Sequence, residues 1–203
     1  WDFYVWPTTF FLFVLSAIAA GPCFTILCTK LTEAISRKKL VPDNAIQFLA
    51  RLSGWLLASY IVLKIIDTLV WANTALPADG LSFGDIYGKG SYGAMMLIGE
   101  IGIFGIVPAI LLLIPQVRRN PAGLIIACLL NCTGIVLNRF IFIIGGLAIP
   151  VFPFERVWSY LPTWQEWGIA MALVGYGFLL FSVSYRYLPV FPREQELNPA
   201  MYA

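Results

Sequence analysis

Residues 45–76 read AIQFLARLSGWLLASYIVLKIIDTLVWANTAL, and this stretch decides the class of fold. A helix needs about 20 mostly apolar residues to cross the hydrocarbon core of a bilayer, so this run spans a membrane with residues to spare. Lys64 and Asp67 lie among its aliphatic side chains. A charged side chain at the centre of a membrane helix costs about 2.5–3.5 kcal/mol even on insertion scales, so both residues need polar partners.

The whole chain shares this apolar character. Of its 203 residues 60% are hydrophobic and 12% are charged, and the mean hydropathy is +0.82. Soluble proteins average roughly 45–50% apolar and about 25% charged residues. The net charge of +2 and the scattering of basic residues over short loops argue against a nucleic-acid partner. The composition therefore predicts an integral membrane protein.

Five stretches are long and apolar enough to span the bilayer, and they cover residues of about 8–28, 45–76, 93–114, 122–149 and 165–188. Pro108 lies inside the third stretch and predicts a kink there, because proline lacks the N–H that an inner helical turn uses. We expect an all-α fold, a polytopic transmembrane helical bundle of about five membrane-spanning helices. It forms a single helical domain over residues 1–203.

The loop charges predict the orientation. Eight basic residues follow the first, third and fifth spans, whereas the alternate loops hold only two. The eight are Lys30, Arg37, Lys38, Lys39, Arg118, Arg119, Arg186 and Arg193, and the two are Lys89 and Arg156. Basic loops face the cytoplasm. We expect a multi-pass protein of the inner (cytoplasmic) membrane with an external N-terminus and a cytoplasmic C-terminus.

Charged residues on three spans should share one level of the membrane. Lys64, Asp67, Glu100 and Arg139 all fall within the outer half, and the last three lie about 10–15 Å from the external ends of their helices. Tyr60, Lys64 and Asp67 follow an i, i+4, i+7 pattern on one helix face. We expect two neutralising pairs, Lys64 with Asp67 and Glu100 with Arg139.

Two interpretations of this polar layer stay open. Closed ion pairs would merely hold the helices in register. Alternatively, the layer is a proton-conducting or ligand-binding cavity in which the carboxylates exchange protons and the side chains of Tyr60 and Asn138 supply hydrogen bonds. Ionisable groups inside membranes usually mark functional sites, which favours the cavity.

Metal centres are not predicted. The chain has no histidine, and its four cysteines, at positions 23, 28, 128 and 132, form no C-x-x-C pair. Zinc, haem and Rieske sites therefore lack their usual ligands. We interpret the cysteines as small packing residues.

Aromatic residues gather in the external loop before the fifth span, at Trp158, Tyr160 and Trp164. Tryptophan and tyrosine form belts at the headgroup level of membranes, and they also anchor protein interfaces. The cluster predicts an aromatic belt, a docking surface for an extrinsic subunit, or both.

Several segments together resemble one known family. These are LFVLSAIAAGPCFTIL (residues 12–27), the Tyr60 to Asp67 segment YIVLKIID, the helix of Glu100, the segment LNRF at residues 137–140, and the run that begins YLPTWQEWG at Tyr160. They are similar to the C-terminal half of the NrfD/PsrC family of polysulfide reductase-type membrane subunits, in the branch of hydrogenase-2 and DsrP-type proteins. The resemblance covers nearly the whole chain.

The resemblance implies a haem-free membrane subunit of a respiratory oxidoreductase complex. Such a subunit exchanges electrons between menaquinone and an extrinsic, ferredoxin-like iron–sulfur subunit on the external face, and it contacts other membrane subunits and lipid. By position, Asp67, Glu100 and Arg139 become proton-path or quinone-proximal groups, and the iron–sulfur clusters belong to the partner. Two other classes remain: a secondary transporter or ion-translocating module, and a purely structural membrane anchor.

Overall fold

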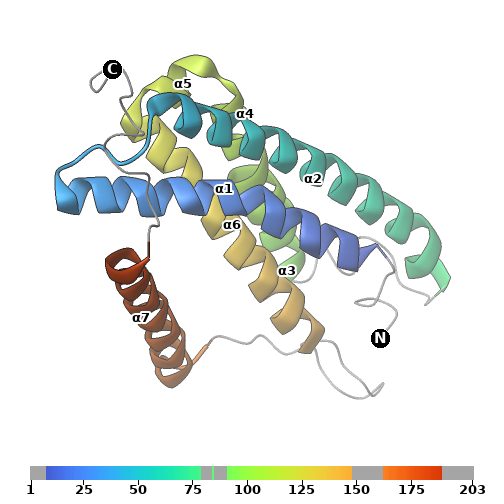
Figure 1. Ribbon diagram of the computed structural model, residues 1–203. Coiled ribbons are helices and arrows are strands. Elements are labelled where there is room, and N and C mark those ends of the chain that lie inside the picture. The colour runs from blue at the N-terminus through green and yellow to red at the C-terminus, as the bar shows by residue number, and fades with distance from the viewer. Residues whose placement is uncertain (1–7, 79–83, 85–90, 148–161, 189–203) are drawn as a thin grey trace.

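The computed structural model describes residues 8–78, 84, 91–147 and 162–188, and these residues form helices without any strand. Figure 1 shows the helices crossing one another in a bundle. Among the described residues, five segments are long and apolar enough to cross a membrane, namely Thr9–Ser36, Asp43–Thr74, Met95–Leu113, Pro121–Ile143 and Trp164–Tyr187. The predicted all-α class and the five predicted spans are therefore confirmed.

The third span is composite, whereas the other four are single α-helices. The elements in chain order are α1 (Thr9–Ser36), α2 (Asp43–Ala78), α3 (Ser91–Ala94), the π-helix η2 (Met95–Ile106), α4 (Val107–Leu113), α5 (Pro115–Arg119), α6 (Pro121–Leu147) and α7 (Trp164–Tyr187). The third span thus begins with 12 residues of π-helix, directly after the short helix α3, and becomes α-helix at Val107. A long π-helix is rare, and π-helical turns are frequent at functional sites.

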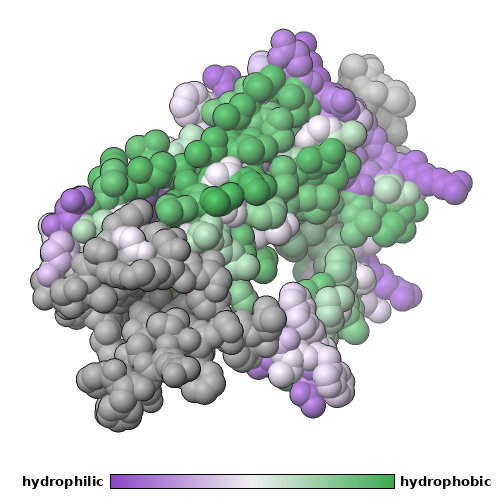
Figure 2. Space-filling view, turned by 180° about the vertical axis from the view of Figure 1, so that it is seen from behind, coloured by the Kyte–Doolittle hydropathy of each residue, from purple (hydrophilic) through white to green (hydrophobic). Residues whose placement is uncertain are grey.

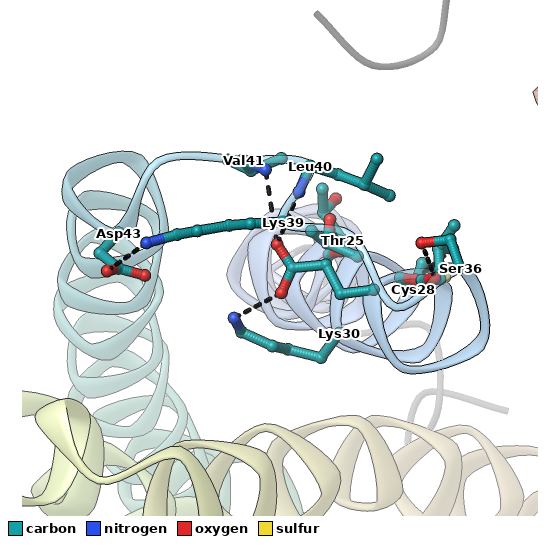
Figure 3. Close-up of polar contacts among 11 residues, drawn as sticks. Thr25, Cys28, Lys30, Ser36, Lys39, Leu40, Val41 and Asp43 are labelled. Atoms are coloured by element: carbon teal, nitrogen blue, oxygen red, sulfur yellow. Dashed lines mark hydrogen bonds and ion pairs between the residues drawn. The ribbon is translucent and has the colours of Figure 1, made fainter. Parts of the chain in front are cut away.

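Helix α1 continues to Ser36, beyond its expected end near residue 28, because polar side chains extend it past the apolar run. Glu33 binds Lys30 Nζ at 2.7 Å through Oε2, and its Oε1 accepts the backbone N–H groups of Leu40 and Val41 at 3.1 and 3.4 Å. Arg37 then ends the helix in a left-handed conformation, with φ of 55°. Figure 3 shows Lys30, Leu40 and Val41 pointing toward one carboxylate at the α1–α2 connection.

Four spans form the core, and α1 packs on both α2 and α6, while η2 and α4 pack between α2 and α6. One apolar cluster lies toward the α1–α2 connection and comprises Cys23, Ile26, Ile46, Ala50, Leu112, Leu124, Ala127 and Cys128. A second apolar cluster lies further along the bundle and comprises Ala19, Leu57, Tyr60, Ile61, Ile101 and Ala109. The two clusters hold the four spans together from one end to the middle of the bundle.

Pro108 lies at the second residue of α4, so the kink predicted there takes the form of a change of helix type. Because Pro108 has no N–H, the carbonyl of Phe104 loses the donor that an α-helix would give it. This carbonyl faces Gly134 of α6, where an added Cβ would lie 2.7 Å from the oxygen. Glycine is therefore needed at position 134 for α6 to approach η2 this closely.

Helix α7 buries no residue against the rest of the bundle. In Figure 1 it stands apart from the other four spans. Its start is stabilised by a capping box, in which Thr163 and Glu166 exchange hydrogen bonds. Local sequence signals, rather than packing on the described residues, therefore define this helix.

We expect Gly134→Ala to destabilise the protein, although alanine ordinarily favours a helix. The new methyl group would press on the backbone of Phe104, and overpacking of this kind costs about 1–3 kcal/mol. Thermal unfolding in detergent measures the effect. Gly175→Ala on α7 is the matched control, because nothing lies within 4 Å of its Cβ position. Equal melting temperatures for the two variants would contradict the close contact.

Candidate functional site

A buried polar cluster joins three spans, and the carboxylate of Glu100 is at its centre. Glu100 Oε1 accepts hydrogen bonds from Tyr60 Oη at 2.9 Å, from Asn138 Nδ2 at 2.8 Å and from Lys64 Nζ, with which it forms an ion pair. Lys64 Nζ and Asn138 Nδ2 also each donate to Tyr60 Oη, both at 3.2 Å. We call these four residues the Glu100 cluster.

Burial strengthens these contacts, and it increases the free energy of unfolding that is lost when one of them is removed. Each of the four side chains belongs to a residue that is at most 8% exposed. A charge withdrawn from water is tolerated only with a partner of opposite sign and with hydrogen bonds, and Lys64 and Glu100 supply both to each other. All three donors converge on Oε1 of Glu100. Its Oε2 takes no part in these bonds.

Local structure places each member. Tyr60 and Lys64 are four residues apart on α2 and so lie on the same face. Glu100 occupies the middle of η2, and Asn138 lies on α6 one residue before Arg139. All four residues belong to the polar layer that the sequence predicts, and the packing of the helices brings them into direct contact.

The predicted pairing of the charges was wrong. Lys64 pairs with Glu100 rather than with Asp67, because the packing of α2 on η2 places the two side chains directly opposite each other. Asp67 Oδ1 instead accepts a hydrogen bond from Thr8 Oγ1 at the start of α1. Asp67 nevertheless lies within electrostatic reach of Lys64.

Arg139 also has a different partner from the one predicted. It points toward α1, where its Nη2 donates to the carbonyl of Phe13 at 2.8 Å and to Ser16 Oγ at 3.1 Å. Its guanidinium carbon lies 3.6 Å from the centre of the Phe13 ring, a cation–π contact. Arg139 remains within electrostatic reach of Glu100. The six predicted site residues thus form one polar region with different pairings.

Two buried atoms of this region have no hydrogen-bond partner among the residues that the structure describes. They are Asn138 Oδ1, an acceptor, and Arg139 Nη1, a donor. Buried polar atoms in proteins almost always have a hydrogen-bond partner, so unpaired atoms of this kind indicate a place where a water molecule or a ligand binds. Together they offer one donor and one acceptor beside the Glu100 cluster.

A second buried polar cluster was not predicted. Asn131 Nδ2 donates to the carbonyl of Ala19, to Ser53 Oγ and to Cys23 Sγ at 3.2–3.3 Å, and Ser53 Oγ also donates to the carbonyl of Ala19. Pro22 lies in the same part of α1, where it removes the backbone N–H that an α-helix would give to the carbonyl of Ile18. Asn131 and Asn138 are seven residues apart on α6 and so lie on the same face of the helix. This spacing is the sequence pattern from which the second cluster could have been predicted.

One residue of the predicted aromatic cluster lies in the described part of the chain. Trp164 is 80% exposed at the start of α7, whereas Trp158 and Tyr160 lie outside the described residues. Among the residues that the structure does describe, no group of three or more histidine, cysteine, aspartate or glutamate side chains is placed to hold a metal ion. All four cysteines are free thiols.

Comparison with known proteins gives the class. The family model described as "Polysulphide reductase, NrfD" matches residues 1–151. The chain therefore belongs to the NrfD family of membrane proteins, as its sequence motifs predicted.

Two relatives bear on its role. The chain is 45% identical over 197 residues to the "Menaquinone reductase, integral membrane subunit" of Nitratidesulfovibrio vulgaris, an alignment that covers 97% of this chain and 47% of that protein. It is 26% identical over 195 residues to a selenate reductase subunit of Mesobacillus selenatarsenatis, covering 92% of this chain and 44% of that protein. The chain thus spans about half the length of these relatives. No solved structure matches it significantly.

We expect Glu100→Gln to lower stability by about 3–5 kcal/mol, because Lys64 is left as a buried charge without a counterion. The double variant Lys64→Met with Glu100→Gln should recover most of that loss, since no buried charge remains in the pair. Thermal unfolding of the parent protein and both variants in detergent measures the loss and its recovery. If the single and the double variant melt together, the loss does not come from an unpaired charge on Lys64.

Proposed function

We propose that this chain is the haem-free part of a membrane subunit in a quinone-linked respiratory oxidoreductase complex. In this role it exchanges electrons between menaquinone and an extrinsic iron–sulfur subunit. Membership of the NrfD family supports the proposal, as do relatives named as subunits of menaquinone and selenate reductases. The chain contributes no histidine with which to ligate haem.

The Glu100 cluster is the observation that carries the proposal. Quinone reduction and quinol oxidation couple two electrons to two protons, so a nearby protein group must accept and release protons. Glu100 meets this need, because its Oε1 is saturated by three donors while its Oε2 is left to take a proton. Lys64 compensates the carboxylate charge when that proton leaves.

The two unpaired buried atoms, Asn138 Oδ1 and Arg139 Nη1, have the hydrogen-bonding chemistry that a quinone headgroup needs. A quinone carbonyl needs a donor and a quinol hydroxyl needs an acceptor, and Arg139 Nη1 and Asn138 Oδ1 supply one of each. Menaquinone, when bound, supplies the two-electron redox chemistry. The protein's own task is to orient the headgroup, hold the proton at Glu100 and pass it outward. Asp67 is suited to that last step, because it lies about one helical turn beyond Lys64 and is only half-buried.

The location of the partners follows from the predicted orientation. The loop charges assign the Glu100 cluster to the outer half of an inner membrane. We therefore propose that the extrinsic, ferredoxin-like iron–sulfur subunit docks on the external face, near Trp158, Tyr160 and Trp164. The exposure of Trp164 at the start of α7 supports this surface. Other membrane subunits would complete the complex.

An ion-translocating module is the second candidate function. The observation that favours it is the change from π-helix to α-helix between η2 and α4, beside Pro108, since transporters bind ions where membrane helices depart from regular α-helical geometry near the middle of the membrane. Such a module would have no need of an iron–sulfur partner. A purely structural anchor, the third class, would show no quinone-linked turnover in any reconstituted complex.

The first test targets the proton path within the intact complex. We expect Asp67→Asn and Tyr60→Phe each to slow quinone-linked turnover by at least about tenfold, because each removes a group that relays or orients a proton. Steady-state assays of the purified complex over a pH series measure this. Ser59→Ala is the matched control, since the Ser59 hydroxyl only donates to the Trp55 carbonyl of its own helix. Normal turnover in both test variants would contradict the proton-path role.

The second test asks which partners accompany the subunit. We expect mild-detergent purification of the tagged protein from its native membrane to yield visible iron–sulfur absorbance and extractable menaquinone. A transporter would copurify with neither. Trp164→Ala should reduce the recovery of iron–sulfur absorbance, whereas Trp55→Ala, which removes an exposed tryptophan from α2, should not. The absence of iron–sulfur absorbance from well-folded preparations would overturn the electron-transfer proposal.

A further inference from the structure

Three arginines meet at the corner where α4 turns into α6. Arg51 comes from α2, and Arg118 and Arg119 come from α5. Burial, together with the positive charges of Arg51 and Arg119, holds the pKa of the Arg118 guanidinium below its ordinary value. Arg51 and Arg119 are therefore each within electrostatic reach of Arg118. We call them the arginine corner.

Nothing among the described residues neutralises this corner. The ion pairs Lys30–Glu33, Lys39–Asp43 and Lys64–Glu100 involve no arginine of the corner. Arg118 Nε is buried without a hydrogen-bond partner. The N-terminus of the 27-residue helix α6 lies two residues beyond Arg119 and adds the positive end of its dipole. Within the described part of the chain, the corner is therefore a concentration of positive charge that has no acidic partner.

The corner is also held firmly in place. Gln47 Nε2 on α2 donates to the Arg118 carbonyl at 2.8 Å, which ties α2 to α5. Arg118 Nη1 donates to the carbonyls of Leu112 and Leu113 at 2.8 and 3.1 Å, which caps the end of α4. Arg51 and Arg119 are exposed, whereas Arg118 is partly buried. Arg118 thus organises the corner, and the other two present their charge outward.

The surroundings of Arg51 identify the kind of partner. Phe48 and Trp55 lie three residues before and four residues after Arg51, so all three share one face of α2. Phe48 is 65% exposed and Trp55 is 57% exposed, so an exposed apolar surface lies beside Arg51. Arg51 is about 12 Å along the helix from its start at Asp43, so its side chain must extend back toward the headgroups.

Figure 2 shows hydrophilic residues gathered at the end of the molecule that carries α5 and the α1–α2 connection, with an apolar band beside them. A ligand for this place needs a phosphate at one end and hydrocarbon at the other. We propose that the arginine corner binds an anionic phospholipid, whose phosphate lies against Arg51 and Arg119 and whose acyl chains pack on Phe48 and Trp55. The site lies on the side of the membrane that the loop charges assign to the cytoplasm. It is independent of the proposed electron-transfer role.

Native mass spectrometry of the detergent-solubilised protein tests this site. Delipidated protein is titrated with phosphatidylglycerol, and separately with phosphatidylcholine. We expect clear selectivity for phosphatidylglycerol in the parent protein. The double variant Arg51→Gln with Arg119→Gln should bind it about tenfold or more weakly, because each guanidinium near an anionic lipid contributes to the attraction. Arg186→Gln, which removes an exposed arginine at the end of α7, should bind as the parent does.

Several outcomes would overturn the proposal. They are equal binding of the two lipids, unchanged phosphatidylglycerol binding in the double variant, and displacement of the bound lipid by inorganic phosphate, which would indicate a site for free anions. Loss of subunit assembly in the double variant with lipid binding intact would assign the corner to an acidic protein partner. If the double variant unfolds, the two single variants carry the comparison, each with a smaller expected loss of affinity.

Discussion

The desolvated carboxylate of Glu100 is the constraint on which the arrangement of the spans depends. It accepts a tyrosine hydroxyl and an ammonium group from α2 and an amide from α6, so three helices must meet at one level. Hydrocarbon offers no alternative partners, and displacement of any of these helices would leave a charge or a dipole unpaired. The same contacts that hold the helices in register engage Glu100 Oε1 and leave its Oε2 out of these bonds, and the proposed proton-accepting role depends on that second oxygen.

A related constraint applies to the backbone, because the prolines and helix breaks release carbonyls that must find other partners. Pro108 frees the carbonyl of Phe104, and Gly134 allows α6 to pack directly against it. On α1, the carbonyl of Ala19 lies close to Pro22 and accepts Ser53 and Asn131. At the end of α4 the carbonyls of Leu112 and Leu113 accept Arg118. In each case, a neighbouring span or turn supplies a small residue or a donor beside the irregular part of the helix.

The polar groups are distributed unevenly along the bundle. The Glu100 cluster, Arg139 and Asp67 lie in one half, whereas the apolar cluster around Leu112 and Leu124 fills the other half without a basic or carboxylate side chain. Ionic groups reappear at the arginine corner and in the α1–α2 connection. This division suits the two proposals, because proton exchange would occur in the outer half and contact with lipid headgroups at the opposite surface.

The sequence by itself determined the membrane class, the five spans, the family and the level that Tyr60, Lys64, Glu100 and Asn138 share. Hydrophobic length and helical spacing are local properties, and they can be read residue by residue. Only the tertiary structure decided which charges pair, because Lys64 has Asp67 on its own helix and Glu100 on another, and only the packing of α2 on η2 selects between them. The partners of Arg139 on α1, the π-helix around Glu100 and the cluster at Asn131 likewise depend on how distant segments pack. Spacing along one helix carries no information about such contacts.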